Sequence, residues 1–181
     1  MKKGGIDMRR KGLVAGVLAL VLLVCTGCGT RASRAHELKK MLSGDITLNM
    51  TYQTDGGSYA VRLSLAPENG AVRQGEARFL SPPSMEGLTV VKSSDGIALR
   101  LGELTLNAPS GEMYAFLFLP FDIRDMDYQN TLYQEDAELV SFENDTKRVL
   151  YTQKKGQPPS HIELSTSGKV YRFVLDWQVE S

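Results

Sequence analysis

Two cysteines near the N-terminus have a spacing that could support chemistry. They stand in Leu-Val-Cys-Thr-Gly-Cys-Gly-Thr, residues 23–30, as Cys25-x-x-Cys28. This is the spacing of a thioredoxin-like redox pair or of one half of a zinc site. A redox pair would sit between a strand and a helix of a folded domain, and a zinc site would need a second ligand pair. The chain has 2 cysteines in all, and an apolar run precedes them, so neither site is expected.

The residues before these cysteines have the order of a secretory signal. A basic stretch at 2–11 precedes an uncharged apolar run at 13–24, and the small residues Thr26 and Gly27 follow. A charged region, a short apolar region and small residues before a cut are typical of a signal peptide. The apolar run is shorter than the roughly 18 to 20 residues that a permanent membrane-spanning helix requires. The pattern therefore predicts a cleaved signal.

The same segment resembles the bacterial lipoprotein signal, whose lipobox ends in a cysteine preceded by small residues. Cys28 fits this pattern because Thr26 and Gly27 precede it, whereas Cys25 would follow the bulky Val24. The resemblance implies that cleavage before Cys28 makes it the new N-terminus and that its sulfur carries a diacylglyceryl anchor. It also implies a lipid-anchored protein on the extracytoplasmic side of the cell membrane, which in a Gram-positive cell is the outer face of the cytoplasmic membrane.

The charge of the remaining chain argues against some partners. Cleavage would remove five of the 21 basic and one of the 21 acidic residues, which leaves 16 basic and 20 acidic residues and a net charge near −4. This balance argues against nucleic-acid binding and against electrostatic attraction to anionic membranes. Membrane attachment would then depend on acyl chains. We expect a signal peptide at 1–27, the lipidated cysteine and a tether at 28–33, and one domain at 34–181.

The elements of that domain follow from the period of its apolar residues. Residues 34–42 carry apolar side chains at helical spacing, which predicts one short amphipathic helix. After it the period changes to two, and turn-forming residues separate the runs, which is typical of antiparallel strands. We expect about ten strands, at residues 46–52, 59–65, 71–80, 88–92, 97–101, 104–106, 137–143, 147–153, 161–165 and 170–179.

A central segment interrupts the strands. Residues 112–119, Glu-Met-Tyr-Ala-Phe-Leu-Phe-Leu, are apolar all round, and Ser110 and Pro120 suit the two ends of a short helix. We expect two short helices between residues 112 and 135. A sheet of about ten strands tends to curl, and the helices can cover its concave face. The predicted fold class is therefore α+β: a curled antiparallel sheet forming an unclosed half-barrel covered by short helices.

The domain lacks the usual catalytic motifs. His36 and His161 are its histidines, and neither belongs to a His-Glu-x-x-His pattern; the chain has no Gly-x-Ser-x-Gly elbow, phosphate-binding loop or dinucleotide fingerprint. A calcium loop starting at Asp125 would need glycine and glutamate where Asn130 and Asp136 stand. We therefore expect histidines that are ordinary surface or strand residues, a solvated acidic loop over 122–127, no enzymatic activity, no metal and no cofactor.

One face of the predicted sheet is strongly apolar. If the helices seal it tightly it is a core, and if they stand off it is a cavity that could take acyl chains. The sequence leaves both interpretations open. The candidate cavity-lining residues are Ile46, Leu48, Met50, Val61, Leu63, Met113, Phe116, Tyr171, Phe173, Leu175 and Trp177.

Three stretches resemble the LolA/LolB lipoprotein-carrier superfamily, particularly its membrane-anchored Gram-positive members. They are Ala-Arg-Phe-Leu-Ser-Pro-Pro-Ser-Met-Glu-Gly-Leu-Thr-Val at 77–90, the Asp-Gly hairpin at 93–104, and the closing hairpin at 157–177. The resemblance implies a LolA-like fold that shields acyl chains between sheet and helices. Some clostridial members instead support a cell-wall amidase in spore germination. Two functions therefore remain open: binding of lipid or lipoprotein acyl chains, or an anchored interaction module for a cell-envelope protein.

Overall fold

The computed structural model describes residues 33–54, 56–68, 71–107 and 114–177. The chain divides at residue 34, and the fold described below is that of residues 35–181. Cys28 and Met113 lie outside the described residues. Within the described ranges, no helix is long and apolar enough to span a membrane.

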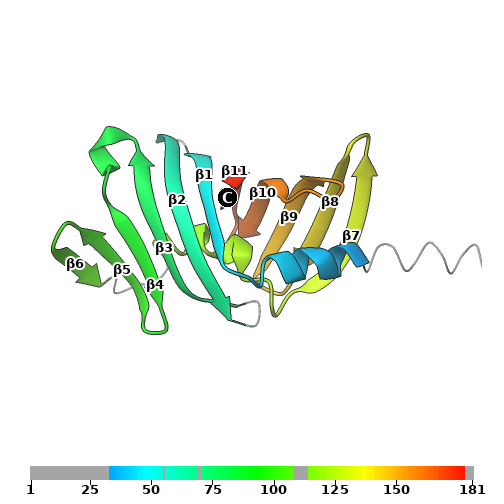
Figure 1. Ribbon diagram of the computed structural model, residues 1–181, viewed down its shortest axis with the longest axis horizontal. Coiled ribbons are helices and arrows are strands. Elements are labelled where there is room, and N and C mark those ends of the chain that lie inside the picture. Colours follow the sequence, from blue (N-terminus) through cyan, green and yellow to red (C-terminus); the bar gives the residue numbers. More distant parts are fainter. Residues whose placement is uncertain (1–32, 55, 69–70, 108–113, 178–181) are drawn as a thin grey trace, which may run out of the picture. The chain divides into compact units, whose positions relative to one another are not determined.

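One antiparallel sheet of 11 strands dominates this unit (Figure 1), in the order β6-β5-β4-β3-β2-β1-β11-β10-β9-β8-β7. Consecutive strands pair with each other except β6 and β7, and β1 pairs with β11, so the first and last strands meet in the middle of the sheet. The strands are β1 (Ile46–Thr54), β2 (Gly57–Glu68), β3 (Ala71–Ser81), β4 (Thr89–Ser93), β5 (Gly96–Leu101), β6 (Leu104–Asn107), β7 (Asp127–Gln134), β8 (Ala137–Glu143), β9 (Lys147–Lys154), β10 (Pro159–Thr166) and β11 (Lys169–Trp177).

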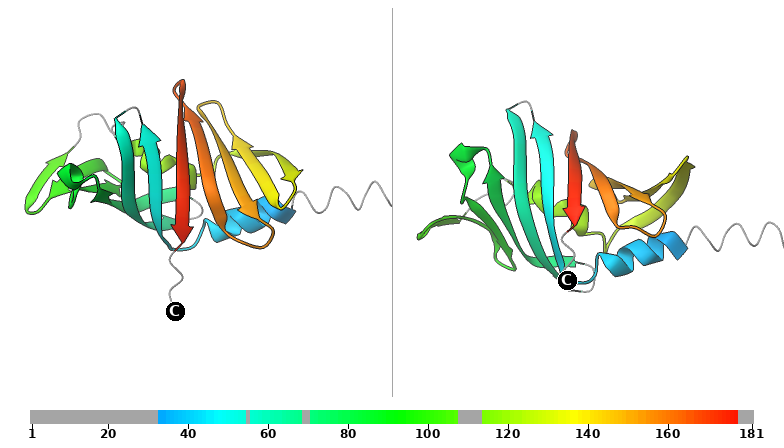
Figure 2. Two further views of the ribbon diagram at one scale, coloured as in Figure 1. Left: turned by 90° about the horizontal axis from the view of Figure 1, so that it is seen from above. Right: turned by 45° about the horizontal axis from the view of Figure 1, so that its top comes forward.

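The predicted fold class is confirmed. The sheet curls (Figure 2), and its edge strands β6 and β7 do not pair with each other, so the half-barrel is unclosed. The strands supply alternating apolar side chains to the concave face, as the period of two predicted. Residues 33–41 are helical, which matches the amphipathic helix expected at 34–42.

The central segment differs from the expectation of two short helices within 112–135. Two short 3₁₀ helices are present, η2 (Ala115–Leu117) and η3 (Leu119–Phe121), but strand β7 follows them at Asp127–Gln134. An edge strand is held by pairing on one side, so it needs little apolar alternation to form. Of the side chains of β7, Thr131 is the one that is buried. The apolar period therefore could not reveal this strand.

The connection between β6 and β7 must cross the concave face, because these strands lie at opposite edges of the sheet (Figures 1 and 2). Its described part, residues 114–126, is called the crossing segment below. Leu117, Phe118, Phe121 and Ile123 from this segment are at most 1% exposed. The crossing segment thus forms one core with the sheet.

The N-terminal helix completes the cover. Leu38 and Leu42 are buried in the same core as the crossing segment. The Lys39 ammonium donates a hydrogen bond to the carbonyl oxygen of Met126 (2.9 Å) and lies 5.4 Å from the ring centre of Phe142 on β8. The helix therefore contacts both the end of the crossing segment and the sheet.

Candidate functional site

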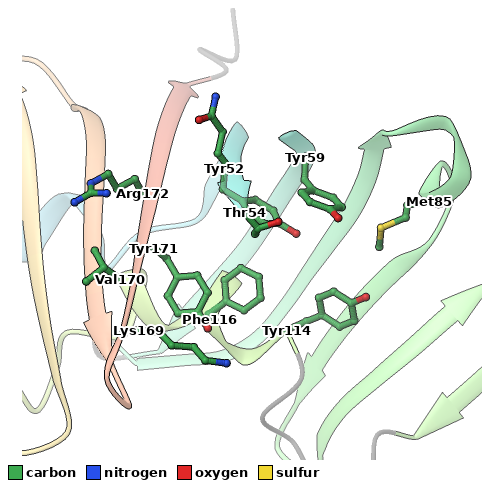
Figure 3. Close-up of a pocket in the computed structure, with 11 residues that line it drawn as sticks. Tyr52, Thr54, Tyr59, Met85, Tyr114, Phe116, Lys169, Val170, Tyr171 and Arg172 are labelled. Atoms are coloured by element: carbon green, nitrogen blue, oxygen red, sulfur yellow. The ribbon is translucent and has the colours of Figure 1, made fainter. Parts of the chain in front are cut away.

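A pocket of about 810 Å³ opens at one end of the concave face, where the turns β1–β2 and β10–β11 lie (Figure 3). This volume falls within the roughly 300–1,000 Å³ of typical ligand sites. Another short 3₁₀ helix, η1 (Pro83–Met85), and the beginning of the crossing segment supply the rest of its wall. The lining residues are Tyr52, Gln53, Thr54, Tyr59, Met85, Tyr114, Phe116, Lys169, Val170, Tyr171 and Arg172.

Strand alternation directs a defined set of these side chains into the pocket. Tyr52 on β1 lies opposite Tyr59 on β2 and Phe173 on β11, so these three residues share the concave face. Lys169 and Tyr171 precede Phe173 on β11 at two-residue intervals, and residues two apart in a strand point to the same side. The sheet register therefore brings Lys169 and the tyrosines to one site.

The neighbouring residues of β11 belong to the rim. Arg172 and Val170 have the opposite parity, and Figure 3 shows both side chains directed away from the pocket. The Nε atom of Arg172 donates to the Glu163 carboxylate at 2.9 Å, and 77% of the Arg172 side chain is exposed. Arg172 is thus already engaged outside the pocket.

The pocket wall is a continuous cluster of aromatic rings. Tyr52 stacks on Tyr59 with ring centres 5.1 Å apart and meets the edge of Phe116 at 5.3 Å. Phe116 stacks on Tyr171 at 4.5 Å with an interplanar angle of 8°, and Tyr114 lies 6.4 Å from Phe116. These spacings are those of favourable aromatic pairs. Phe116 therefore fastens the crossing segment to the sheet at the pocket.

Tyr114, which belongs to this cluster, has an unusual backbone conformation. Its φ of 68° is left-handed, and it stands immediately before η2. A residue other than glycine in this conformation costs roughly 1–2 kcal/mol. The Tyr114 ring meets the edge of Phe79 at 5.7 Å, and such packing offsets part of that cost. Strained residues of this kind concentrate at binding sites.

The tyrosine hydroxyls give the apolar wall a polar component. Within the described part of the chain, the hydroxyls of Tyr52, Tyr59, Tyr114 and Tyr171 make no hydrogen bond to another protein group, and none is a fully buried orphan atom. Burial raises the pKa of Tyr52 well above its ordinary value, and the neighbouring Tyr114 and Tyr59 raise it further. Because the Tyr52 phenol stays protonated, it can donate a hydrogen bond to a ligand.

The residues that the sequence suggested as cavity lining fall into separate places. Phe116 and Tyr171 line the pocket. Trp177 lies at the other end of β11, about 20 Å from Tyr171 at the usual rise per strand residue, and its indole donates to the Pro159 carbonyl oxygen. Met113 lies outside the described residues. The remaining candidates are buried in the core: Ile46, Leu48, Met50, Val61, Leu63, Phe173 and Leu175.

Sequence reasoning did not select several lining residues. Tyr52 and Tyr59 could have been selected as lining residues, since both continue the apolar alternation of their strands. Lys169 shares the parity of Tyr171 but is charged, so an apolar pattern passes over it. Tyr114 and Met85 depend on where the crossing segment and η1 lie, which no local period gives.

A smaller pocket, of about 240 Å³, lies beside the crossing segment and includes Lys147. The Lys147 ammonium donates to the carbonyl oxygens of Leu119 (3.1 Å) and Asp122. Burial lowers the pKa of Lys147, while the nearby Asp122 carboxylate opposes that shift. This lysine ties the crossing segment to β9, so we assign the smaller pocket a structural role.

The other polar residues considered from the sequence lie at the surface. His36 and His161 are exposed, and the Nδ1 atom of His161 is 2.9 Å from the Ser160 hydroxyl. Asp125 and Asp127 are also exposed. Among the described residues, no three potential metal-ligating side chains gather in one place.

No protein-family model matches the sequence, and no curated protein matches it. Among solved structures, an uncharacterized conserved protein from Thermus thermophilus is similar at 12% identity and a TM-score of 0.46, over 81% of this chain and 86% of that one. A domain assigned to outer membrane lipoprotein sorting, from Vibrio parahaemolyticus, is similar at 13% identity and a TM-score of 0.48, over 83% and 91%. A LolA superfamily protein from Nitrosomonas europaea is similar at 9% identity and a TM-score of 0.42, over 77% and 88%. The structural neighbours of this chain thus include LolA superfamily and lipoprotein-sorting proteins.

Proposed function

We propose that this chain is a membrane-anchored, extracytoplasmic and non-enzymatic protein that binds an acyl chain of a lipid or lipoprotein in the aromatic pocket. The observation that carries the proposal is an open pocket of about 810 Å³ beside the part of the concave face that the crossing segment covers. The sequence resemblance to the lipoprotein-carrier superfamily agrees with it.

The pocket wall suits an acyl chain of limited length. The aromatic rings of Phe116 and Tyr171 and the thioether of Met85 offer apolar surface to a ligand. Each buried methylene contributes about 0.8 kcal/mol, so about ten would contribute roughly 8 kcal/mol before the costs of association. Affinities no tighter than about 1 μM are therefore expected.

Binding can be measured with a tryptophan placed in the wall. Trp177 lies far from the pocket, so the reporter is Phe116→Trp in a Trp177→Phe background, in the full chain carrying Cys28→Ser. Titration with dodecanoate below its micelle concentration should shift the fluorescence saturably. Tyr133→Trp in the same background is the control, because Tyr133 is 54% exposed on β7 and away from the pocket. Calorimetry on the chain without the reporter checks that the substitution did not create the site. Absence of heat and of a saturable shift would reject the proposal.

The anchor is tested separately. The resemblance to lipoprotein signals puts the acyl chains on Cys28, so Cys28→Ser should release the protein from membranes or leave it uncleaved on its signal. Cys25→Ser is the matched control and should change nothing, since that residue would be lost with the signal. Unchanged, detergent-dependent fractionation of a cleaved Cys28→Ser protein would contradict the anchor.

A second function is favoured by one specific observation. Leu101, Leu104 and Leu106 on the β5–β6 hairpin are 53%, 76% and 64% exposed, and in the described chain β6 has a partner strand on one side. Exposed apolar residues at a sheet edge are typical of protein-binding sites. The alternative is therefore an anchored module that supports a cell-envelope protein such as a cell-wall amidase. In that case Leu104→Asp would abolish the cellular phenotype while leaving dodecanoate binding unchanged.

A further inference from the structure

We propose that the aromatic pocket selects amphiphiles whose headgroup is an anion, a carboxylate or a phosphate, and that Lys169 is the residue that binds this headgroup. The proposal rests on the proposed function, since it concerns the ligand of the same pocket. It adds a charge preference that an apolar pocket alone would not have.

The position of Lys169 follows from the sheet. It is the first residue of β11, opposite Thr166 of β10, and stands about 7 Å before Tyr171 along the strand. Since the two residues share a face, Lys169 lies at the mouth of the pocket with Tyr171 further in. Figure 3 shows the Lys169 side chain extending below Tyr171 and Phe116 toward the side of Tyr114. A ligand with its chain against the rings would have its headgroup near this ammonium.

The charge of the pocket is positive among the described residues. Lys169 and Arg172 are the charged residues in its lining. Arg172 pairs with Glu163, whereas Lys169 makes no ion pair or hydrogen bond within the described chain. Two acidic residues are adjacent in sequence to lining residues: Asp55 lies outside the described residues, and Glu86 is exposed and is not part of the lining. Lys169 is therefore the cation that the described structure leaves open to a ligand.

The hydroxyl groups strengthen the preference for an anion. Tyr52, Tyr59 and Tyr171 bring phenol donors to the pocket, and Thr54 adds an aliphatic hydroxyl. Carboxylates and phosphates accept several hydrogen bonds at once, and hydrogen bonds to a charged acceptor are stronger than those between neutral groups. The donors and the ammonium thus favour the same kind of headgroup.

A quaternary ammonium headgroup is the competing occupant, because aromatic cages bind such cations through their ring faces. Lys169 argues against it. Like charges in one partly desolvated site repel, and the pocket lining described here contains no carboxylate that would compensate a second cation. The arrangement is therefore better suited to an anion.

The test compares four ligands with the same twelve-carbon chain in the full-length Cys28→Ser protein: dodecanoate, dodecyl phosphate, dodecanol and dodecyltrimethylammonium. Calorimetry is performed below the micelle concentration of each charged ligand and below the solubility limit of dodecanol. We expect at least one anion to bind about tenfold or more tighter than the trimethylammonium compound. If dodecanoate binds and dodecyl phosphate does not, the headgroup is a carboxylate, and the reverse result identifies a phosphate. Either result supports an anionic ligand.

Variants then assign the preference to Lys169. Lys169→Gln should weaken binding of the anion about tenfold and change dodecanol binding less than twofold, while Lys169→Arg should retain anion binding. Lys155→Gln is the matched control, because Lys155 is exposed in the β9–β10 turn at the other end of the sheet.

The outcomes separate the two proposals. If none of the four ligands binds, the acyl-chain function itself fails. If they bind but the trimethylammonium compound equals or exceeds the anions, the headgroup inference is overturned and the function stands. Equal losses in Lys169→Gln and Lys155→Gln would also overturn it, since net charge would then explain the effect.

Discussion

The β8–β9 hairpin and the β5–β6 hairpin present similar apolar residues to the same side of the sheet but reach opposite environments. Val140 and Phe142 on β8 are 0% exposed. On the other hairpin, Leu106 lies opposite Leu99 and Leu104 lies opposite Leu101, yet Leu104 is 76% exposed. The difference shows that alternation selects a face, whereas the segment that crosses the face decides whether it becomes core.

Specific side-chain contacts hold the helix and the crossing segment over β8 and β9. Lys39 of the helix lies over Phe142, and the hydroxyl of Tyr151 on β9 donates to the carbonyl oxygen of Pro120 in η3. Phe142 and Tyr151 themselves meet edge to face at 6.0 Å. Leu104 and Leu106, by contrast, are outside the core cluster and are 76% and 64% exposed. The pocket lies between these two regions, where the crossing segment begins.

The largest expected effect is in the covered hairpin. Phe142→Ala should lower the free energy of unfolding by about 3–5 kcal/mol, because it leaves a cavity among rigid neighbours. Denaturant unfolding followed by circular dichroism measures it. A loss below about 1 kcal/mol would mean that the cover over β8 is loose.

The next test asks where the crossing segment meets the other half of the sheet. A Cβ built at Gly75 on β3 would stand 2.7 Å from the Leu65 Cδ2 atom and 3.0 Å from the Phe118 Cε1 atom. Gly75→Ala should therefore lower the free energy of unfolding by about 1–3 kcal/mol through overpacking. Leu65 can change rotamer, so the cost depends mainly on Phe118. A neutral or stabilising result would show that Phe118 is not fixed against β3.

Alkaline pH offers a graded test of the same cover. Burial raises the pKa of Tyr151 well above its ordinary value of 10.0, and the nearby Asp122 acts in the same direction. Below pH 10 the group is protonated in both states and contributes no pH dependence. Above it the unfolded chain loses the proton and the folded chain keeps it, so the free energy of unfolding should fall by up to about 1.4 kcal/mol per pH unit. In Tyr151→Phe this part of the pH dependence of the free energy of unfolding should disappear. Equal slopes for the unchanged protein and Tyr151→Phe between pH 10 and 11 would contradict the buried phenol.

Much of this fold can be predicted from the sequence, because the apolar period along each strand determines which side chains share a face of the sheet. The period of two in Leu48 and Met50, and again in Val61 and Leu63, assigns these side chains to one face, and they lie there fully buried. Strand β7 could not be found in this way, since pairing with β8 rather than apolar alternation holds it. The pocket was also out of reach of local patterns, because it exists where Phe116 of the crossing segment meets β1 and β11 and Tyr114 meets β3.

The smallest expected effect is at the open hairpin, and it tests the comparison most directly. Leu104→Ser should change the free energy of unfolding by no more than about 0.5 kcal/mol, because an exposed side chain buries little area to lose. Leu104 and Phe142 are both apolar residues on the strand positions of one sheet, so they form a matched pair that differs in cover. If Leu104→Ser cost about 2 kcal/mol or more, a value typical of core truncation, some part of the chain outside the described residues would have to cover β6. The protein-binding alternative would then lose its surface. A negligible cost together with lower self-association or partner binding would instead identify the hairpin as a contact site, independent of the pocket.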